Sequence, residues 1–357
     1  MPTGIALMIA SMFLIRIDQA ELKLARNIDF LGISLAAISL LCLLVVLEEG
    51  RRQGWYESGM ILSLTILSGV SAYLFLWREL TCQHPVIDLR AFLHQGFSIG
   101  CFYGFVFGAI LYVPLFLLPL YLAEVRAIDT LEIGTIVVVL GVSMVLSTPI
   151  AGLLLRLAHI RLVAFIGFFG MAIGTWLQGQ LTGEQGFTDL VVPQVIRGLA
   201  SQCCWLSVVT LALGSIPTDQ VKNASALFNL MMRLGAAVAI ALASNSLENN
   251  TLRHYSEIAD SVSFDQPSVG VDIPRLSGLF AGRYGDSPTS DQAGINILVE
   301  IATRQAMTMA FNDVTRMAAV LCGLALLLLP FFRHKTALVE SRRSNSRSQH
   351  HSKISDK

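Results

Sequence analysis

Charge is scarce in this sequence, and that scarcity excludes a water-soluble fold. Only 14% of the 357 residues are charged, whereas 54% are hydrophobic. The hydrophobic residues are gathered into runs that approach the roughly 20 residues a helix needs to cross a bilayer. Because several such runs in series cannot share one soluble core, the sequence predicts an all-α integral membrane protein. The eight runs are approximately Phe30–Leu47, Gly59–Trp77, Phe97–Leu122, Gly134–Leu155, Leu162–Leu181, Leu190–Ile216, Ala224–Ala243 and Met317–Phe332.

The sequence also lacks the patterns of disulfide, metal and catalytic chemistry. Five of its six cysteines lie inside the apolar runs, where a free cysteine behaves as a small hydrophobic residue. No Cys or His cluster has metal-ligand spacing, and no nucleophile stands with a base. We therefore expect no catalytic residue, no metal, no cofactor and no nucleic-acid partner, and we do not expect an enzyme.

A third absence concerns carboxylates. None of the apolar runs carries Asp or Glu near its centre. Proton relays in pumps and transporters typically use buried carboxylates or histidines. The sequence thus offers no obvious proton carrier within these runs.

Lys and Arg gather in alternate connections, which predicts the orientation because cytoplasmic loops carry the excess. A shorter run, Gly4–Ile15, fits part of a membrane helix better than a signal peptide, since it lacks a basic start and an Ala-x-Ala site. Counting it, the pattern predicts nine crossings, with Met1 outside and a basic tail after Phe332 in the cytoplasm. A start outside the membrane suggests that an odd number of helices is missing upstream. The polar connection 244–313, with an amphipathic segment at Asn296–Phe311, is predicted as a long extracytoplasmic loop.

Two stripes of polar residues lie inside the apolar runs. Gln194 and Arg197 share one helical face of the sixth run, and Asn229 and Arg233 share one face of the seventh. Ionisable residues in a span usually face a bundle interior or a watery cavity. Two alternatives remain open from the sequence: the four residues line a substrate cavity, or they bind carbonyls and amides that hold the bundle together.

Small residues one turn apart predict close helix contacts, because they let two backbones approach. Gly100, Gly104 and Gly108 form a GxxxGxxxG repeat, and Gly170 and Gly174 form a GxxxG motif. We expect these five glycines to lie in helix interfaces.

The order of several motifs resembles the second half of the 14-helix drug:proton antiporters of the major facilitator superfamily, the EmrB/QacA type. His84-Pro-Val-Ile-Asp-Leu-Arg-Ala-Phe92 resembles the start of that half. Leu118-Pro-Leu-Tyr-Leu122 is similar to the end of its first helix. Gln194-Val-Ile-Arg-Gly198 and Asn223-Ala-Ser-Ala-Leu-Phe-Asn229 resemble its fourth and fifth helices.

The resemblance implies a domain organisation. Residues 1–15 would be part of a transmembrane helix, 16–96 two additional central helices with cytoplasmic connections, 97–333 a C-terminal six-helix bundle, and 334–357 a basic cytoplasmic tail. The chain departs from the family's Gly-rich cytoplasmic motif, which would be read at Gly152–Arg161. Arg156 and His159 stand where Asp and Gly are expected.

The resemblance also implies efflux of hydrophobic compounds by proton antiport at the bacterial inner membrane. Its partners would be the lipid bilayer and a hydrophobic substrate. The rival interpretation is a truncated or split half-transporter that acts only with a partner that supplies the N-terminal bundle. That partner would be a separately encoded N-terminal half, and a periplasmic adaptor is the alternative partner.

Overall fold

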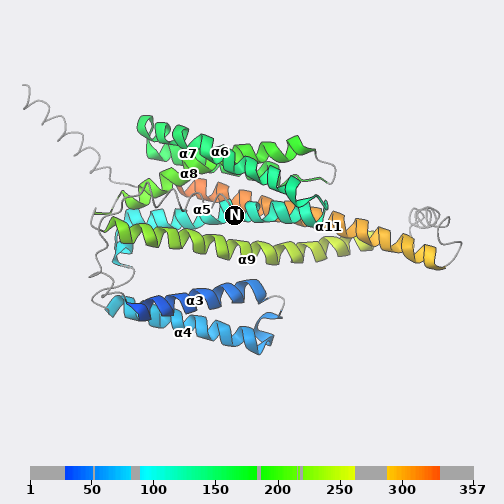
Figure 1. Ribbon diagram of the computed structural model, residues 1–357, viewed down its shortest axis with the longest axis horizontal. Helices are drawn as coiled ribbons and strands as arrows, with labels where there is room; N and C mark the ends of the chain where they lie inside the picture. Colours follow the sequence, from blue (N-terminus) through cyan, green and yellow to red (C-terminus); the bar gives the residue numbers. More distant parts are fainter. Residues whose placement is uncertain are drawn as a thin grey trace, which may run out of the picture. The chain divides into compact units, whose positions relative to one another are not determined.

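The computed structural model describes residues 29–50, 53–81, 89–182, 186–214, 216–217, 220–261 and 288–329. Over these residues it is all-helical, without a β-strand (Figure 1). Within these described ranges, eight helices are long and apolar enough to cross a membrane, so the predicted fold class is confirmed. They are α3 (Phe30–Glu49), α4 (Gly59–Thr81), α5 (Gln95–Glu124), α6 (Thr130–Leu157), α7 (Ile160–Gln178), α8 (Phe187–Leu213), α9 (Val221–Ser261) and α11 (Pro288–Leu328). The predicted helix at Gly4–Ile15 and the tail 334–357 lie outside the described residues.

The chain divides into two compact units, Met1–Leu89 and Arg90–Lys357. In the first unit α3 and α4 pack against each other. Asp29 caps the start of α3 by accepting a hydrogen bond from the Gly32 backbone N–H at 3.0 Å. The same carboxylate accepts three hydrogen bonds from Arg78 of α4: from Nε at 2.7 and 3.0 Å, and from Nη2 at 2.8 Å. The Arg78 guanidinium and the Gly32 N–H lower the pKa of the Asp29 carboxyl to about 2, so this ion pair joins the start of α3 to the end of α4.

The second unit is a bundle of α5, α6, α7, α8, α9 and α11. Its main helix contacts are α7 with α8, α5 with α9, α6 with α8 and α9 with α11. Tyr121 of α5 packs its ring edge-on against Phe311 of α11, with ring centroids 5.3 Å apart, and both belong to one core of buried apolar residues. These contacts fix the positions of α5, α7, α8 and α9, which carry the predicted site residues.

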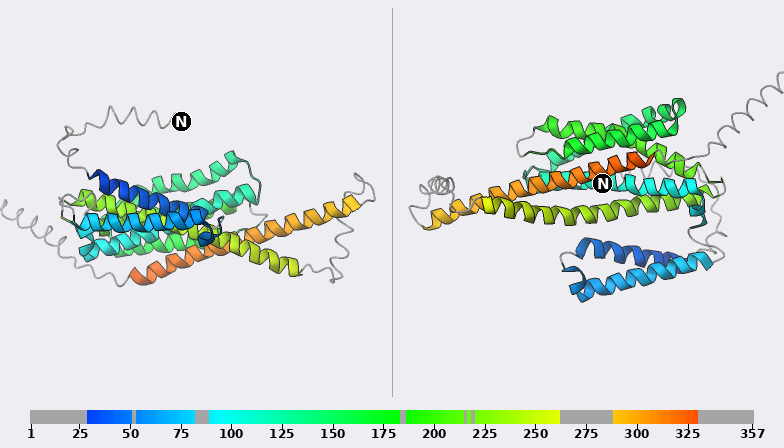
Figure 2. Two further views of the ribbon diagram at one scale, coloured as in Figure 1. Left: turned by 90° about the horizontal axis from the view of Figure 1, so that it is seen from below. Right: turned by 180° about the vertical axis from the view of Figure 1, so that it is seen from behind.

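Two helices of the bundle are longer than a bilayer requires. Both α9 and α11 have 41 residues, about 60 Å of helix against a hydrocarbon core of roughly 30 Å. Figures 1 and 2 show both running past the ends of the other bundle helices.

The structure therefore differs from the loop predicted over 244–313, because α9 continues through Ser261 and α11 begins at Pro288. Residues 247–261 contain neither Pro nor Gly, and proline is favoured at the first position of a helix. Pairs one turn apart support both extensions: Arg253 with Glu257 at 2.9 Å, and Arg304 with Glu300 at 2.7 Å. The predicted helical segment Asn296–Phe311 lies within α11.

Candidate functional site

Close contact between α5 and α9 depends on glycines in both helices. A Cβ added at Gly108 would meet the backbone carbonyl oxygen of Met232, and one added at Gly104 would lie 2.7 Å from the Phe228 ring. From the other side, a Cβ at Gly235 would meet the carbonyl oxygen of Phe105. Gly100, two turns before Gly108 in α5, lies against Ala212 of α8. Only glycine permits backbones to approach this closely.

The contact between α7 and α8 has the same character. A Cβ at Gly170 would lie 2.7 Å from the Ala200 Cβ, and one at Gly174 would lie 2.5 Å from Cγ of Arg197. Because Gly174 has no side chain, the aliphatic part of the Arg197 side chain can pass next to it. This places the arginine between α7 and α8 and directs its head toward α5.

Arg197 is completely buried and is held by neutral oxygens. Its Nη1 donates to Gln178 Oε1 at 2.7 Å and to Gln194 Oε1 at 3.3 Å, and its Nη2 donates to the Leu111 carbonyl oxygen at 3.1 Å. No carboxylate pairs with it among the described residues, and its Nε is buried there without a hydrogen-bond partner. A buried charge without a counter-charge is costly, and these hydrogen bonds to neutral oxygens offset part of that cost.

Gln178 completes the cluster by binding α5 as well. Its Nε2 donates to the Pro114 carbonyl oxygen at 3.2 Å. Because Pro114 lacks an N–H, it interrupts the backbone hydrogen bonding of α5 near this position. Together, Arg197 and Gln178 tie α7 and α8 to two carbonyls beside that interruption. The sequence analysis missed Gln178, whose one signal was a lone amide near the end of an apolar run.

Asn229 and Arg233 lie in different surroundings. Both are exposed on α9, one turn apart. The Asn229 amide donates to the Ser225 carbonyl oxygen at 2.8 Å, and the Arg233 guanidinium lies 5.9 Å from the centroid of the Tyr112 ring. The structure thus keeps the four predicted residues in two sets, with Gln194 and Arg197 inside the bundle and the other two on its surface.

Three aromatic side chains pack together where α5, α8 and α9 meet. Trp205 of α8 is half-buried and packs against Phe107 of α5 and Phe228 of α9, with ring centroids 5.8 and 5.6 Å apart. This aromatic cluster is large, mainly apolar and contributed by three helices. Such walls suit hydrophobic ligands that a few polar groups orient.

A second polar connection, which the sequence analysis also missed, holds the end of α7 to α11. Asn312 accepts from the Leu181 N–H at 2.8 Å and donates to the Leu181 carbonyl oxygen at 2.7 Å. Arg316 donates to the Gly179 carbonyl oxygen at 2.9 Å and lies 6.0 Å from the Trp176 ring centroid. These bonds cap the carbonyl end of α7 and fix the helix that supplies Gln178.

Comparison with known proteins finds sequence similarity to transporters over most of the chain. The multidrug export protein EmrB of Escherichia coli K12 is 28% identical over 338 residues, covering 92% of this chain and 62% of that protein. The colistin resistance protein EmrB of Acinetobacter baumannii is 28% identical over 305 residues, covering 85% and 59%. The uncharacterized MFS-type transporter YhcA of Bacillus subtilis is 24% identical over 335 residues, covering 93% and 62%.

No model of a protein family matches the chain. The chain spans about three fifths of the length of the curated relatives that it matches. The helices of both units fall within the matched portion, because the similarity covers up to 93% of the chain.

Proposed function

Since the homologues of this chain are multidrug transporters of the EmrB/QacA type in the major facilitator superfamily, we propose that it takes part in efflux of hydrophobic compounds by proton antiport. In this proposal the exposed face of α9 at Asn229 and Arg233 is a wall of the substrate cavity. The main support for this proposal is that Arg233 is exposed and lies over the ring of Tyr112. Tyr112 is in the middle of α5. A charged side chain facing lipid at that depth costs about 2.5–3.5 kcal/mol on insertion scales, so this face is expected to meet water.

Gln194 and Arg197 contribute from behind this wall. Their side chains are buried, and Arg197 bonds to α5 and α7 as well as to its own helix. They hold α5 in the position that brings Tyr112 over Arg233. Their effect on the substrate is therefore indirect, through the shape of the wall.

The proposed transport cycle requires more helices than this chain supplies in its described residues. Transporters of this kind bind substrate near the midplane between two repeats that rock against each other. The relatives carry about two fifths of their length outside the portion that this chain matches. In our proposal that portion, from whichever polypeptide carries it, supplies the opposite wall and the proton-carrying groups, and the tail after Phe332 lies in the cytoplasm.

A reconstituted efflux assay tests this proposal. Proteoliposomes would contain the chain either alone or with the part of Escherichia coli EmrB that it does not match, and ethidium export would be followed under an imposed pH gradient. We expect gradient-driven export only when both are present, and its loss when the gradient is collapsed with an ionophore. Export by the chain alone would contradict the two-part mechanism, and export that persists without the gradient would contradict proton antiport.

A further inference from the structure

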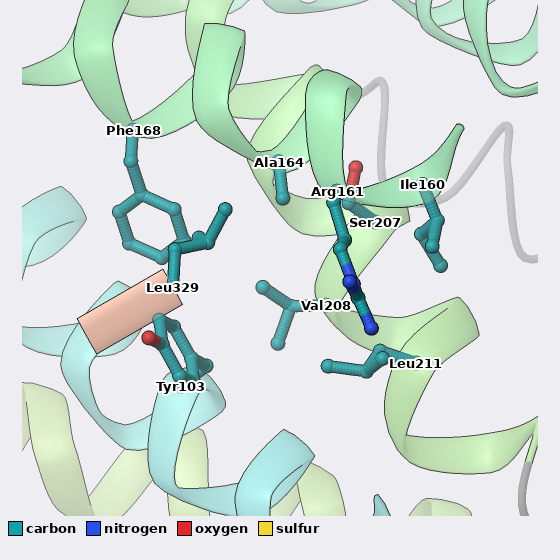
Figure 3. A pocket seen from close by; sticks show the side chains of 9 residues that line it. All are labelled: Tyr103, Ile160, Arg161, Ala164, Phe168, Ser207, Val208, Leu211 and Leu329. Carbon is teal, nitrogen blue, oxygen red and sulfur yellow. The ribbon is translucent and has the colours of Figure 1, made fainter. Parts of the chain in front are cut away.

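Two openings in the bundle differ in size and in polarity. The crevice at the start of α7, with Tyr103, Phe168 and Leu329 in its wall, has an accessible volume of about 20 Å³, which holds about one water molecule (Figure 3). The opening between α9 and α11 has an accessible volume of about 410 Å³. It is lined by Asn250, Arg253, Asp313, Arg316, Met317 and Val320. Water can therefore reach the charged groups that join these two helices.

His254 of α9 lies between two carboxylates beside the larger opening. Its Nε2 is 2.7 Å from Oδ2 of Asp313 on α11, and its Nδ1 is 3.3 Å from Oε2 of Glu257, almost one turn further along α9. The His254 side chain is 19% exposed and the Asp313 side chain is 37% exposed. The contact is therefore partly shielded from water and still accessible to protons. It connects the two helices beyond the apolar run of α9, which ends near Ala243.

Both contacts of His254 are hydrogen bonds only when the imidazole carries a proton on each nitrogen. An ionised carboxylate only accepts hydrogen bonds, whereas a neutral imidazole donates from one nitrogen and presents a lone pair on the other. A neutral ring would therefore turn its lone pair toward one of the two carboxylates, and that contact would be repulsive. The arrangement of the three side chains thus favours the doubly protonated, positively charged ring.

The other charged groups that the described helices bring to this contact are arginines and carboxylates. Arg253 of α9 is paired with Glu257, and Arg316 of α11 lines the same opening. α5, which packs along α9, ends at Glu124. The end of α7 lies against α11, and the sequence from Leu162 to Gly183 has no titratable side chain. Because arginines and carboxylates ordinarily keep their charge between about pH 6 and 8, the histidine is the group here that takes up a proton in that range.

We propose that His254 is a proton-binding site whose charged form holds the projecting part of α9 to α11. When the ring takes a proton from water, it donates to Asp313 and Glu257 together; when it releases that proton, one of the two bonds is lost and the helices are held less firmly. The pH on that side of the membrane thereby controls one end of the helix that carries Asn229 and Arg233. The inference concerns the contact between α9 and α11 and does not rest on the proposed transport.

Hydrogen exchange of the purified full chain tests the proposal. Exchange is followed by mass spectrometry at about pH 6 and about pH 8, and rates are corrected for the pH dependence of the chemical exchange step. We expect the backbone amides of residues 250–260 to exchange about fivefold more slowly at the lower pH, a factor typical of a partly exposed ion pair. The amides of α7 are the internal reference and should show no such difference. Equal corrected rates at both pH values in residues 250–260 would overturn the proposal.

Three variants assign the pH effect to this histidine. His254→Gln keeps an amide donor but cannot gain a charge, so its corrected exchange rates should be the same at both pH values. Asp313→Asn removes the carboxylate on α11 at constant size and should also abolish the difference; it decides the question if His254→Gln does not fold. His159→Gln makes the same change at an exposed histidine before α7 and should keep the full difference. A pH effect that persists in either of the first two variants, or that is lost in the third, would contradict the assignment.

Discussion

Gly108→Val is expected to remove most of the folded protein from the membrane. The first atom of the new side chain would collide with the carbonyl oxygen of Met232, a backbone atom that cannot rotate away. Relief requires separation of α5 and α9 along a contact that also includes Gly104 and Gly235. Overpacking of this kind costs about 1–3 kcal/mol, and more where backbone must move. Folded yield and melting temperature of the purified chain measure the effect.

Gly141→Val in α6 is the matched control for this substitution. It makes the same chemical change within a membrane helix, but no heavy atom lies within 4 Å of the added Cβ. We expect its melting temperature to stay close to that of the unchanged chain. Equal losses in both variants would show that the valine side chain itself is harmful, and would contradict the close α5–α9 contact.

Arg197→Ala is also expected to lower the stability of the folded chain. The change empties a fully buried volume and leaves the acceptors on Gln178, Gln194 and Leu111 without this donor. Truncating a large buried side chain to alanine typically costs about 2–5 kcal/mol, and hydrogen bonds between membrane helices add about 0.6 kcal/mol each. We expect a total of about 3–5 kcal/mol, measured as a loss of melting temperature and of abundance.

The alanine variants of the two arginines should therefore have different phenotypes. Arg233→Ala removes an exposed side chain and should leave abundance and melting temperature almost unchanged, while efflux per molecule falls. Arg197→Ala should reduce efflux mainly in proportion to folded protein. A stable Arg197→Ala protein that has lost transport would show that this arginine binds the substrate directly, against the role that its burial indicates.

The sequence was sufficient to predict the spans but not the surroundings of the polar stripes. Eight apolar runs predicted eight membrane-length helices, because hydrophobicity and length decide that outcome locally. Helical spacing also placed Gln194 with Arg197, and Asn229 with Arg233, on common faces. It could not show that other helices cover the first face and leave the second open, because this depends on how α5 and α7 pack. The sequence left cavity lining and structural support as open alternatives for that reason.

The ends of α9 and α11 show a second limit. Polar composition between Ser244 and Asp313 favoured a loop, whereas much of that segment is helical in the structure. Polar residues do not prevent a helix when pairs such as Arg253 with Glu257 support it and Pro or Gly is absent. The binding partners of Asn312 and Arg316 were also unpredictable, because both act on backbone atoms that follow α7.

Labelling of single cysteines most directly tests the claim that Asn229 and Arg233 face a substrate cavity. All six native cysteines would first be replaced by alanine, and Asn229→Cys, Arg233→Cys and Leu242→Cys introduced singly in membranes that contain the efflux-competent assembly. Leu242 is 59% exposed and lies on the opposite side of α9, so it reports a lipid-facing position. We predict that a hydrophilic maleimide labels positions 229 and 233 but not 242, and that ethidium slows the labelling at both. Labelling at none of the three positions, or labelling that ethidium does not slow, would contradict the account.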